Sequence, residues 1–406
     1  MGLKNSHLIA RAYPFTDIFT RINKVDADLA RRPVLVAWML EDAALQSGWQ
    51  EGPFLGTERE LMEQFNISRD TLREAIRIVE ARGSMQMQRG RRGGLQLLRP
   101  RTEDMAAALA AYLQAHNLTQ AALRSAVSAG EPVLAMLGDE ELFVTLYRQT
   151  AALFSTGKTP GTANANRAMN ISSRLLESHG PPPENGIFLG NEALLCEQLG
   201  CTRPALREAL RLLGDLSILT VRRGRGGGFS LVQPSPDAMI RRLFGLFASR
   251  HLTLADLMPS VFGLYLIRLR LAMRNLQLLD DQTRQLRCGE IASVLHQYSE
   301  PVRWFRLQGE LDRVCGNKFI SILAESFTYY LARLNQTDES WNAAITRWNE
   351  IDAALLAAGS ELVQALRDGN AAEAERLHQN MHDHISWALN CPVKSRPIPA
   401  LTRFCF

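Results

Sequence analysis

The chain has 406 residues and a formal net charge of +4, with 46% hydrophobic and 22% charged residues, a composition typical of a globular protein of two or three domains. It contains no apolar run long enough to span a membrane, and its first residues lack the continuous apolar core of a signal peptide. The six cysteines form no CxxC pair and no zinc-binding spacing, so we expect free thiols in a protein of the reducing cytoplasm.

Three helices are predicted in the first hundred residues. One is expected near 33–47, and Thr57 with Glu60 has the spacing of a capping box that opens a second, short helix. Ser68 is a favourable N-cap for the third helix. The apolar face of that helix comprises Leu72, Ile76 and Val79. Its opposite face is charged and comprises Arg69, Asp70, Arg73 and Arg77.

A β-hairpin is expected after these helices, with strands at 84–88 and 95–98 joined by the segment RGRRGG. Three helices followed by a hairpin are typical of a winged helix-turn-helix domain, whose third helix enters the major groove of DNA. Arginine pairs with the O6 and N7 atoms of guanine. Arginines carried on glycines bring guanidinium groups close to phosphates or into the minor groove. The sequence therefore predicts binding to a double-stranded DNA operator.

The same pattern occurs a second time, 134 residues further along the chain. Residues 54–100 align without a gap with residues 188–234, and 20 of the 47 pairs are identical, including Glu58 with Glu192. Such a repeat indicates an internal duplication. We therefore expect both copies to bind DNA.

The second copy predicts the same elements. A helix is expected near 166–178, a later helix is expected to be capped by Thr202, and hairpin strands are expected at 218–222 and 229–232. The inward face of the capped helix comprises Leu206, Leu210 and Leu213. Its outward face comprises Arg203, Arg207 and Arg211.

The segments FLGTERELMEQFNISRDTLREAIRIVEARGSMQMQRGRRGG and FLGNEALLCEQLGCTRPALREALRLLGDLSILTVRRGRGGG resemble the DNA-binding domain of GntR-type bacterial transcriptional regulators. For the first copy the resemblance implies DNA contacts at Arg59, Ser68, Arg69, Thr71, Arg73, Arg89, Gly90 and Arg91. For the second copy it implies contacts at Thr202, Arg203, Ala205, Arg207, Arg223, Gly224 and Arg225. Asp70 departs from the family pattern, and Ala193 lacks the arginine that Arg59 supplies. The two copies are therefore expected to read unequal half-sites.

The remainder of the chain is predicted to be helical. The segments GNKFISIL and ALRDGNAAEAERL resemble the FCD-type effector domain of the FadR subfamily. This resemblance implies an antiparallel helical bundle that dimerises and senses small organic acids. We thus expect a mainly α fold with two winged helix-turn-helix domains and this C-terminal bundle. The expected segments are an N-terminal arm (1–30), a first winged domain (31–100), a truncated helical spacer (101–157), a linker (158–165), a second winged domain (166–234), the effector and dimerisation domain (235–391) and a tail (392–406).

Many effector domains of this type bind a divalent ion through one Asp and three His. Here the resemblance places Val302, Arg306, Gly359 and Met381 in the four ligand positions. These residues are not ordinary metal ligands, so no metal and no cofactor are expected. His378 and His382 have a chelating i, i+4 spacing but no third ligand in reach, so they are expected to line the effector pocket or to lie on a solvated face. Arg306 is expected to pair there with an anionic effector.

The sequence does not predict an enzyme. No nucleophile elbow, zinc-protease motif or P-loop occurs, and Lys318 has no setting for a Schiff base. Two functions remain open. One is a regulator controlled by a small metabolite, and the other is a ligand-independent architectural protein or constitutive repressor with a decayed sensor domain.

Overall fold

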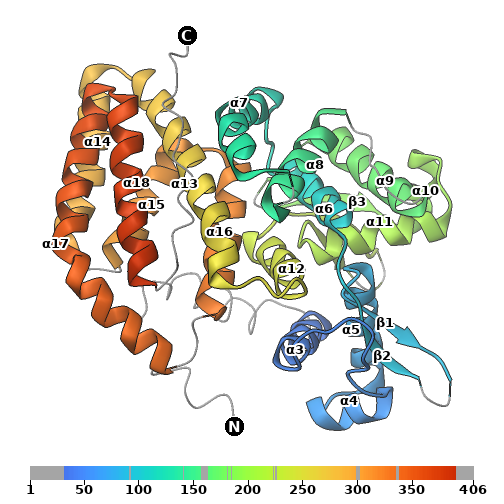
Figure 1. The fold of residues 1–406 in the computed structure, drawn as a ribbon. Coiled ribbons are helices and arrows are strands. Elements are labelled where there is room, and N and C mark those ends of the chain that lie inside the picture. Colours follow the sequence, from blue (N-terminus) through green and yellow to red (C-terminus); the bar gives the residue numbers. More distant parts are fainter. Residues whose placement is uncertain are drawn as a thin grey trace. The chain divides into compact units, whose positions relative to one another are not determined.

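The computed structural model describes residues 32–90, 93–139, 141–156, 163–180, 182–183, 185–222, 224, 226–298, 302–334 and 338–389, and these are mainly helical (Figure 1). They form two compact units. The described residues of the sheet unit lie within 32–120 and 145–251. Those of the bundle unit lie within 121–144 and 252–389.

The first module of the sheet unit contains four helices and a hairpin. Its elements are α3 (Arg32–Gln46), α4 (Glu58–Phe65), α5 (Arg69–Ala81), β1 (Met85–Gln88), β2 (Gly94–Leu97) and α6 (Thr102–Ala115). The predicted capping box is present, because Thr57 accepts a hydrogen bond from the amide of Glu60 and the Glu60 side chain accepts one from the amide of Thr57. Ser68 caps α5, and the predicted apolar face of α5 is buried. Local capping and periodicity therefore account for these helices.

The second module repeats this order. Its elements are α9 (Ala163–His179), β3 (Ile187–Gly190), α10 (Glu192–Leu199), α11 (Arg203–Asp215), β4 (Leu219–Arg222), β5 (Gly228–Leu231) and α12 (Pro236–Ala248). Helix α10 corresponds to α4, and α11 corresponds to α5. In both pairs the first and the last residues differ by 134 positions. The three strands form an antiparallel sheet in the order β3-β5-β4. In the first module the strand equivalent to β3 is reduced to one bridge, between Phe54 and Gln96.

The segment expected as a spacer, 101–157, is helical and is divided between the units. Helix α6 packs against α9 and α12 in the sheet unit. Helix α8 (Leu142–Thr156) lies mostly in the sheet unit, whereas most of α7 (Gln120–Leu137) belongs to the bundle unit. Helix α12, which the sequence placed at the start of the effector domain, groups with the sheet unit because its side chains are buried there.

The bundle unit consists of helices that run alongside one another (Figure 1). After α7 its elements are α13 (Leu254–Gln277), α14 (Asp281–Gln297), α15 (Val302–Cys315), α16 (Lys318–Leu334), α17 (Asp338–Asp368) and α18 (Ala371–Ala388). Helix α7 is held to this bundle because Asn317 donates a 2.9 Å hydrogen bond to the carbonyl oxygen of Ala122, and Arg274 donates one of 2.9 Å to Ser125. Within the described ranges, no helix is long and apolar enough to cross a membrane.

Candidate nucleic-acid interface

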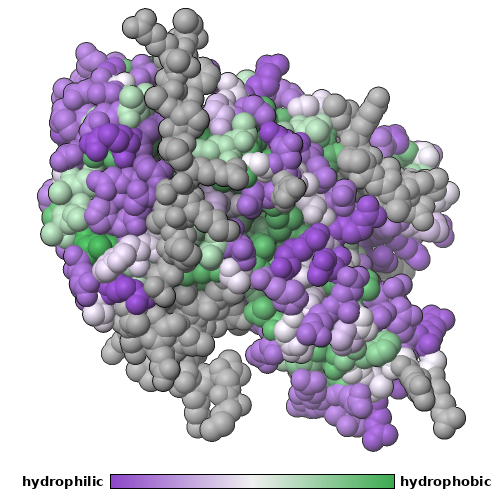
Figure 2. All heavy atoms as spheres, viewed as in Figure 1, coloured by the Kyte–Doolittle hydropathy of each residue, from purple (hydrophilic) through white to green (hydrophobic). Residues whose placement is uncertain are grey.

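The turn between α4 and α5 sets the direction of the arginine-bearing face of α5. Helix α4 ends at Asn66, whose φ of 50° lies in the left-handed region, and α5 begins directly after Ser68. A residue in the left-handed conformation ends the helix and turns the chain, and asparagine tolerates this conformation well. Hydrophilic residues cover the neighbouring α4 on the face drawn in Figure 2. The two helices thus form a helix-turn-helix with an exposed polar surface.

An ion pair links the two helices. The Nε atom of Arg73 on α5 lies 2.8 Å from Oε1 of Glu58, the first residue of α4, and Nε of Arg69 lies 3.7 Å from the same oxygen. The side chain of Arg73 remains 55% exposed. The contact with Glu58 uses Nε of Arg73. It does not use the two terminal nitrogens, which form the fork that pairs with guanine. Glu58 therefore positions Arg73.

The same ion pair recurs in the second module. Nε of Arg207 on α11 lies 3.0 Å from Oε2 of Glu192, the first residue of α10, and the Arg207 side chain is 63% exposed. Sequence reasoning assigned no role to Glu58 or Glu192. The available signal was their identity in the repeat, together with the identity of their arginine partners.

The other expected contact residues of α4 and α5 are also at the surface. Arg59 is exposed and pairs with Glu63 one turn further along its own helix, at 3.0 Å. The Ser68 hydroxyl lies 2.8 Å from that of Thr71 and accepts a 3.3 Å hydrogen bond from the Thr71 amide. These two residues therefore define the N-terminal end of α5, which is the end that suits a phosphate oxygen.

The corresponding positions of the second module differ in three respects. Thr202 occupies the N-cap of α11 but makes no side-chain capping hydrogen bond, unlike Ser68. Ala205 is only 7% exposed, because it lies on the side of α11 that packs into the module. Arg203 is exposed, while Ala193 stands where the first module has Arg59. The two exposed surfaces are therefore similar but unequal.

The two hairpins have matching turns. The amide of Gly93 donates a 3.0 Å hydrogen bond to the carbonyl oxygen of Gly90, and Gly227 donates one of 2.9 Å to Gly224. A Cβ atom on Gly93 or Gly227 would lie 2.2 or 2.3 Å from a backbone oxygen of the preceding strand, so each turn requires glycine. Arg89 is exposed beside the first turn. Arg91, Arg223 and Arg225 lie outside the described residues.

Of the three expected effector residues, His378 and His382 pack against the ring of Phe262, whereas Arg306 does not line the cavity that His382 lines. His382 on α18 lines a small cavity of the bundle unit that is partly open to solvent, and its walls include Tyr265, Trp304 and Trp348. Arg306 is exposed on α15 and lies over the ring of Tyr298, with its guanidinium carbon 5.5 Å from the ring centre. It is not among the lining residues of the cavity in the described part of the chain.

His378 lies one turn before His382 and is fully buried between aromatic rings. Its ring centre is 5.5 Å from that of Phe262 and 6.0 Å from that of Trp304. Among the described residues neither of its ring nitrogens has a hydrogen-bond partner. Burial and the neighbouring His382 and Arg268 lower the pKa of His378 to about 3, so the ring is neutral.

The expected ligand positions of the metal site hold apolar or exposed residues. A Cβ on Gly359 would lie 2.9 Å from Leu295 and 3.6 Å from Met381, so this position is filled by packing. Within the described ranges, no three His, Cys, Asp or Glu side chains form a group that could hold a metal ion.

This helix-turn-helix with its hairpin defines a DNA-binding domain of the winged type. The family model for bacterial regulatory proteins of the gntR family matches residues 36–93, from α3 to the hairpin turn. Comparison with curated proteins found no match. The chain therefore contains a GntR-family helix-turn-helix domain, which supports a DNA-binding transcriptional regulator rather than an enzyme.

Proposed function

We propose that the chain is a sequence-specific transcriptional regulator of the GntR type that carries two DNA-binding heads, at 31–100 and 166–234. The observation that carries this proposal is the repeated ion pair between the first residue of one helix and an exposed arginine of the next, Glu58 with Arg73 and Glu192 with Arg207. An isolated surface ion pair adds little stability. Its occurrence in both modules is better explained by a shared need to orient an arginine toward DNA.

The matching element bounds support an origin by duplication. In ordinary regulators of this class two chains supply two recognition helices, since one helix buries too little surface for useful specificity. In this chain one molecule supplies both. Once the first head is bound, the second meets its half-site at a high effective concentration. Self-association through the bundle unit would add further heads but is not required for binding.

Two single substitutions test the two-headed proposal. Arg73→Ala and Arg207→Ala should each weaken binding to a selected operator by about 1–3 kcal/mol, because each removes one arginine from a base edge or phosphate. Footprints of the two variants should lose protection at opposite half-sites. Arg376→Ala is a matched control, since Arg376 is an exposed arginine in an ion pair with Glu373 on α18.

This experiment distinguishes the contributions of the two heads to DNA binding. If Arg207→Ala changes neither affinity nor footprint while Arg73→Ala does, the second module is a structural remnant and a dimer must supply the second head. If both variants bind like the unchanged protein, the exposed arginine face does not contact DNA.

A second proposed function is control by a small molecule in the bundle cavity. The unpartnered polar atoms among its described lining residues are Nε2 of His382 and Nε1 of Trp348, and no arginine or lysine lines it. These walls favour an uncharged aromatic ligand over the organic acid that the family resemblance implies. The expected pairing of Arg306 with an anion gains no support from its exposed position.

Thermal unfolding distinguishes these ligands. Indole, at concentrations well above its dissociation constant, should raise the melting temperature, and benzoate should raise it less. Trp348→Phe keeps a six-membered aromatic ring but removes the N–H group, so it should reduce the indole effect. If no small aromatic compound raises the melting temperature, the architectural or constitutive repressor function is favoured.

A further inference from the structure

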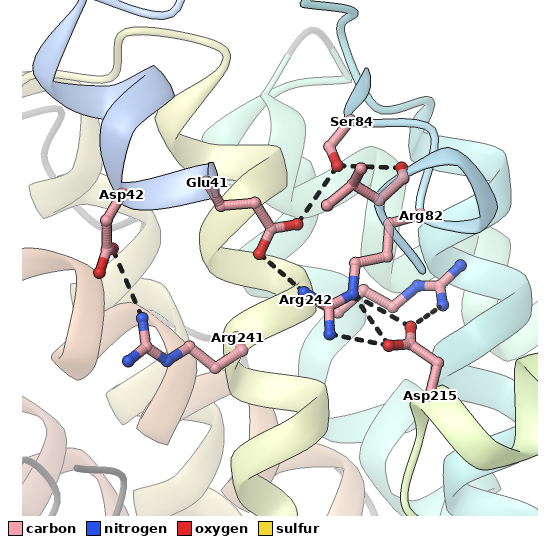
Figure 3. A network of polar contacts seen from close by, with 8 residues as sticks. Glu41, Asp42, Arg82, Ser84, Asp215, Arg241 and Arg242 are labelled. Atoms are coloured by element: carbon pink, nitrogen blue, oxygen red, sulfur yellow. Dashed lines mark hydrogen bonds and ion pairs between the residues drawn. The ribbon is translucent and has the colours of Figure 1, made fainter. Parts of the chain in front are cut away.

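A buried cluster of charged residues joins the two modules of the sheet unit (Figure 3). Arg82 follows the last residue of α5, and Asp215 is the last residue of α11. The Nη2 and Nε atoms of Arg82 donate hydrogen bonds of 2.7 and 3.0 Å to Oδ1 of Asp215. Both side chains are only 2% exposed. The ends of the two arginine-bearing helices are thus tied together by a charge-assisted, forked contact.

Each member of this pair also has a partner within its own module. Glu41 on α3 accepts a 2.7 Å hydrogen bond from Nη1 of Arg82. Arg242 on α12 donates a 2.8 Å hydrogen bond to Oδ2 of Asp215 and one of 3.3 Å to the carbonyl oxygen of Ala81 in the first module. Two guanidinium groups and two carboxylates therefore share one buried site, and their charges balance.

The four charged residues are not repeated between the modules. At an offset of 134 residues, Arg82 corresponds to Leu216, Asp215 to Ala81, Glu41 to Leu175 and Arg242 to Ala108. Each charged residue thus has an apolar residue at the equivalent position of the other module. The arginines of the exposed helix faces are kept, since Arg69, Arg73 and Arg77 correspond to Arg203, Arg207 and Arg211.

The asymmetry opposes pairing of like with like. Two first modules in contact would place Arg82 against the alanine that stands at the Asp215 position, and two second modules would place Asp215 against a leucine. Arg82 would then keep only Glu41 as its partner, and Asp215 only Arg242, so the buried hydrogen bonds between Arg82 and Asp215 would be lost, which is unfavourable. A first module with a second module is the combination that adds the hydrogen bonds between Arg82 and Asp215 to the two pairs within the modules.

We propose that the Arg82–Asp215 contact, supported by Glu41 and Arg242, is a specificity element that pairs the two heads of one chain with each other and fixes the distance between their DNA half-sites. This inference rests on the proposed two-headed function. Because the contact lies at the C-terminal ends of α5 and α11, it sets the separation of their exposed faces. A chain whose two heads are held together by this contact binds half-sites at one spacing only.

Two charge-balanced variants remove the contact between modules. Glu41→Leu with Arg82→Leu leaves the pair of Asp215 and Arg242 intact. Asp215→Ala with Arg242→Ala leaves the pair of Glu41 and Arg82 intact. Each variant removes one positive and one negative charge. The new residues are apolar, as at the equivalent positions, so each variant should fold, because replacing buried ion pairs by apolar side chains is often tolerated.

The readout is affinity for duplexes in which the spacing of two half-sites varies by single base pairs. The half-sites are obtained by selection from random duplex DNA with the unchanged protein. Moving one half-site by half a helical turn, about 5 base pairs, should weaken binding of the unchanged protein by about tenfold or more. For both variants the same change should cost less than about threefold, because their heads can adjust.

Three controls interpret this result. Binding of the variants to a duplex with one half-site should stay within about twofold of the unchanged protein, since the arginine faces are untouched. Glu373→Ala with Arg376→Ala, a charge-balanced change in the bundle unit, should keep the sharp spacing dependence. The variants should also match the unchanged protein in far-UV circular dichroism.

Each of three outcomes would contradict a different claim. If either folded variant keeps the sharp spacing dependence, the ion pair does not set the spacing. If the unchanged protein tolerates all spacings equally while gaining from a second half-site, the heads are not locked. If the unchanged protein binds one half-site as tightly as two, the two-headed function itself fails.

Discussion

The protonation of a titratable side chain in this protein depends on how deeply packing buries it. His378 is neutral because it lies among aromatic rings, and the pKa of its side chain falls to about 3. In the unfolded chain the same group has its ordinary value of 6.5. A group whose pKa is lowered on folding binds protons more readily when unfolded, so acid favours unfolding.

The resulting prediction concerns stability between pH 7 and pH 5. The contribution of His378 to the free energy of unfolding is fully present above about pH 6.5 and is lost as the pH falls toward about 3, at about 1.4 kcal/mol per unit. By pH 5 the loss should be about 2 kcal/mol. His378→Met should show a correspondingly smaller loss of stability over this interval in urea titrations. His384→Met on the same helix serves as the control, and an equal effect of the two substitutions would contradict the assignment.

The buried cluster between the modules illustrates the same point for carboxyl groups. Burial raises the pKa of Glu41, and the nearby Arg82 offsets this only in part. Burial acts on Asp215 in the same direction, but two arginines, Arg82 and Arg242, outweigh it and leave the pKa of Asp215 below its ordinary value. Glu41 also lies near the like charge of Asp215, which raises its pKa further, whereas Asp215 is hydrogen-bonded to both of its arginines.

At the scale of elements, the two equivalent helices α5 and α11 begin differently. The hydroxyl of Ser68 accepts a hydrogen bond from the third residue of α5, whereas that of Thr202 makes no capping bond. The sequence predicted a cap in both modules. The difference arises because a capping bond depends on the side-chain rotamer, which residue type alone does not specify.

Substitution of the caps measures this difference. Ser68→Ala should lower the free energy of unfolding by about 1 kcal/mol, because one amide at the start of α5 loses its acceptor. Thr202→Ala should lower it by no more than a few tenths of a kcal/mol, since no capping bond is lost. Denaturant titration of the two variants side by side checks the comparison. An equal loss at both positions would show that Thr202 also caps its helix in solution.

At the scale of the whole molecule, the prediction concerns the salt dependence of DNA binding. The net charge of +4 is small, so attraction to DNA comes from arginines gathered on the helices and hairpins. With about 8–12 groups able to reach phosphates, a plot of log affinity against log salt concentration should have a slope of roughly −5 or steeper. Arg207→Ala should reduce the size of the slope by about 1. A slope near zero for the unchanged protein would contradict DNA binding.

The sequence by itself determined the elements and the exposed arginine faces. Capping residues, apolar periodicity and turn glycines act over a few residues, so α4, α5 and the hairpins follow from short segments. The repeat was also visible without a structure. It predicted α10 and α11 at the offset at which they occur.

Only the tertiary structure decided which of these residues are buried together. Arg82 and Asp215 are 133 residues apart in the chain, and neither has a charged counterpart in the other module that would have pointed to the contact. Folding likewise leaves Arg306 at the surface and encloses His378. Burial and pairing depend on which distant segments exclude water from a side chain, and that is a property of packing rather than of local sequence.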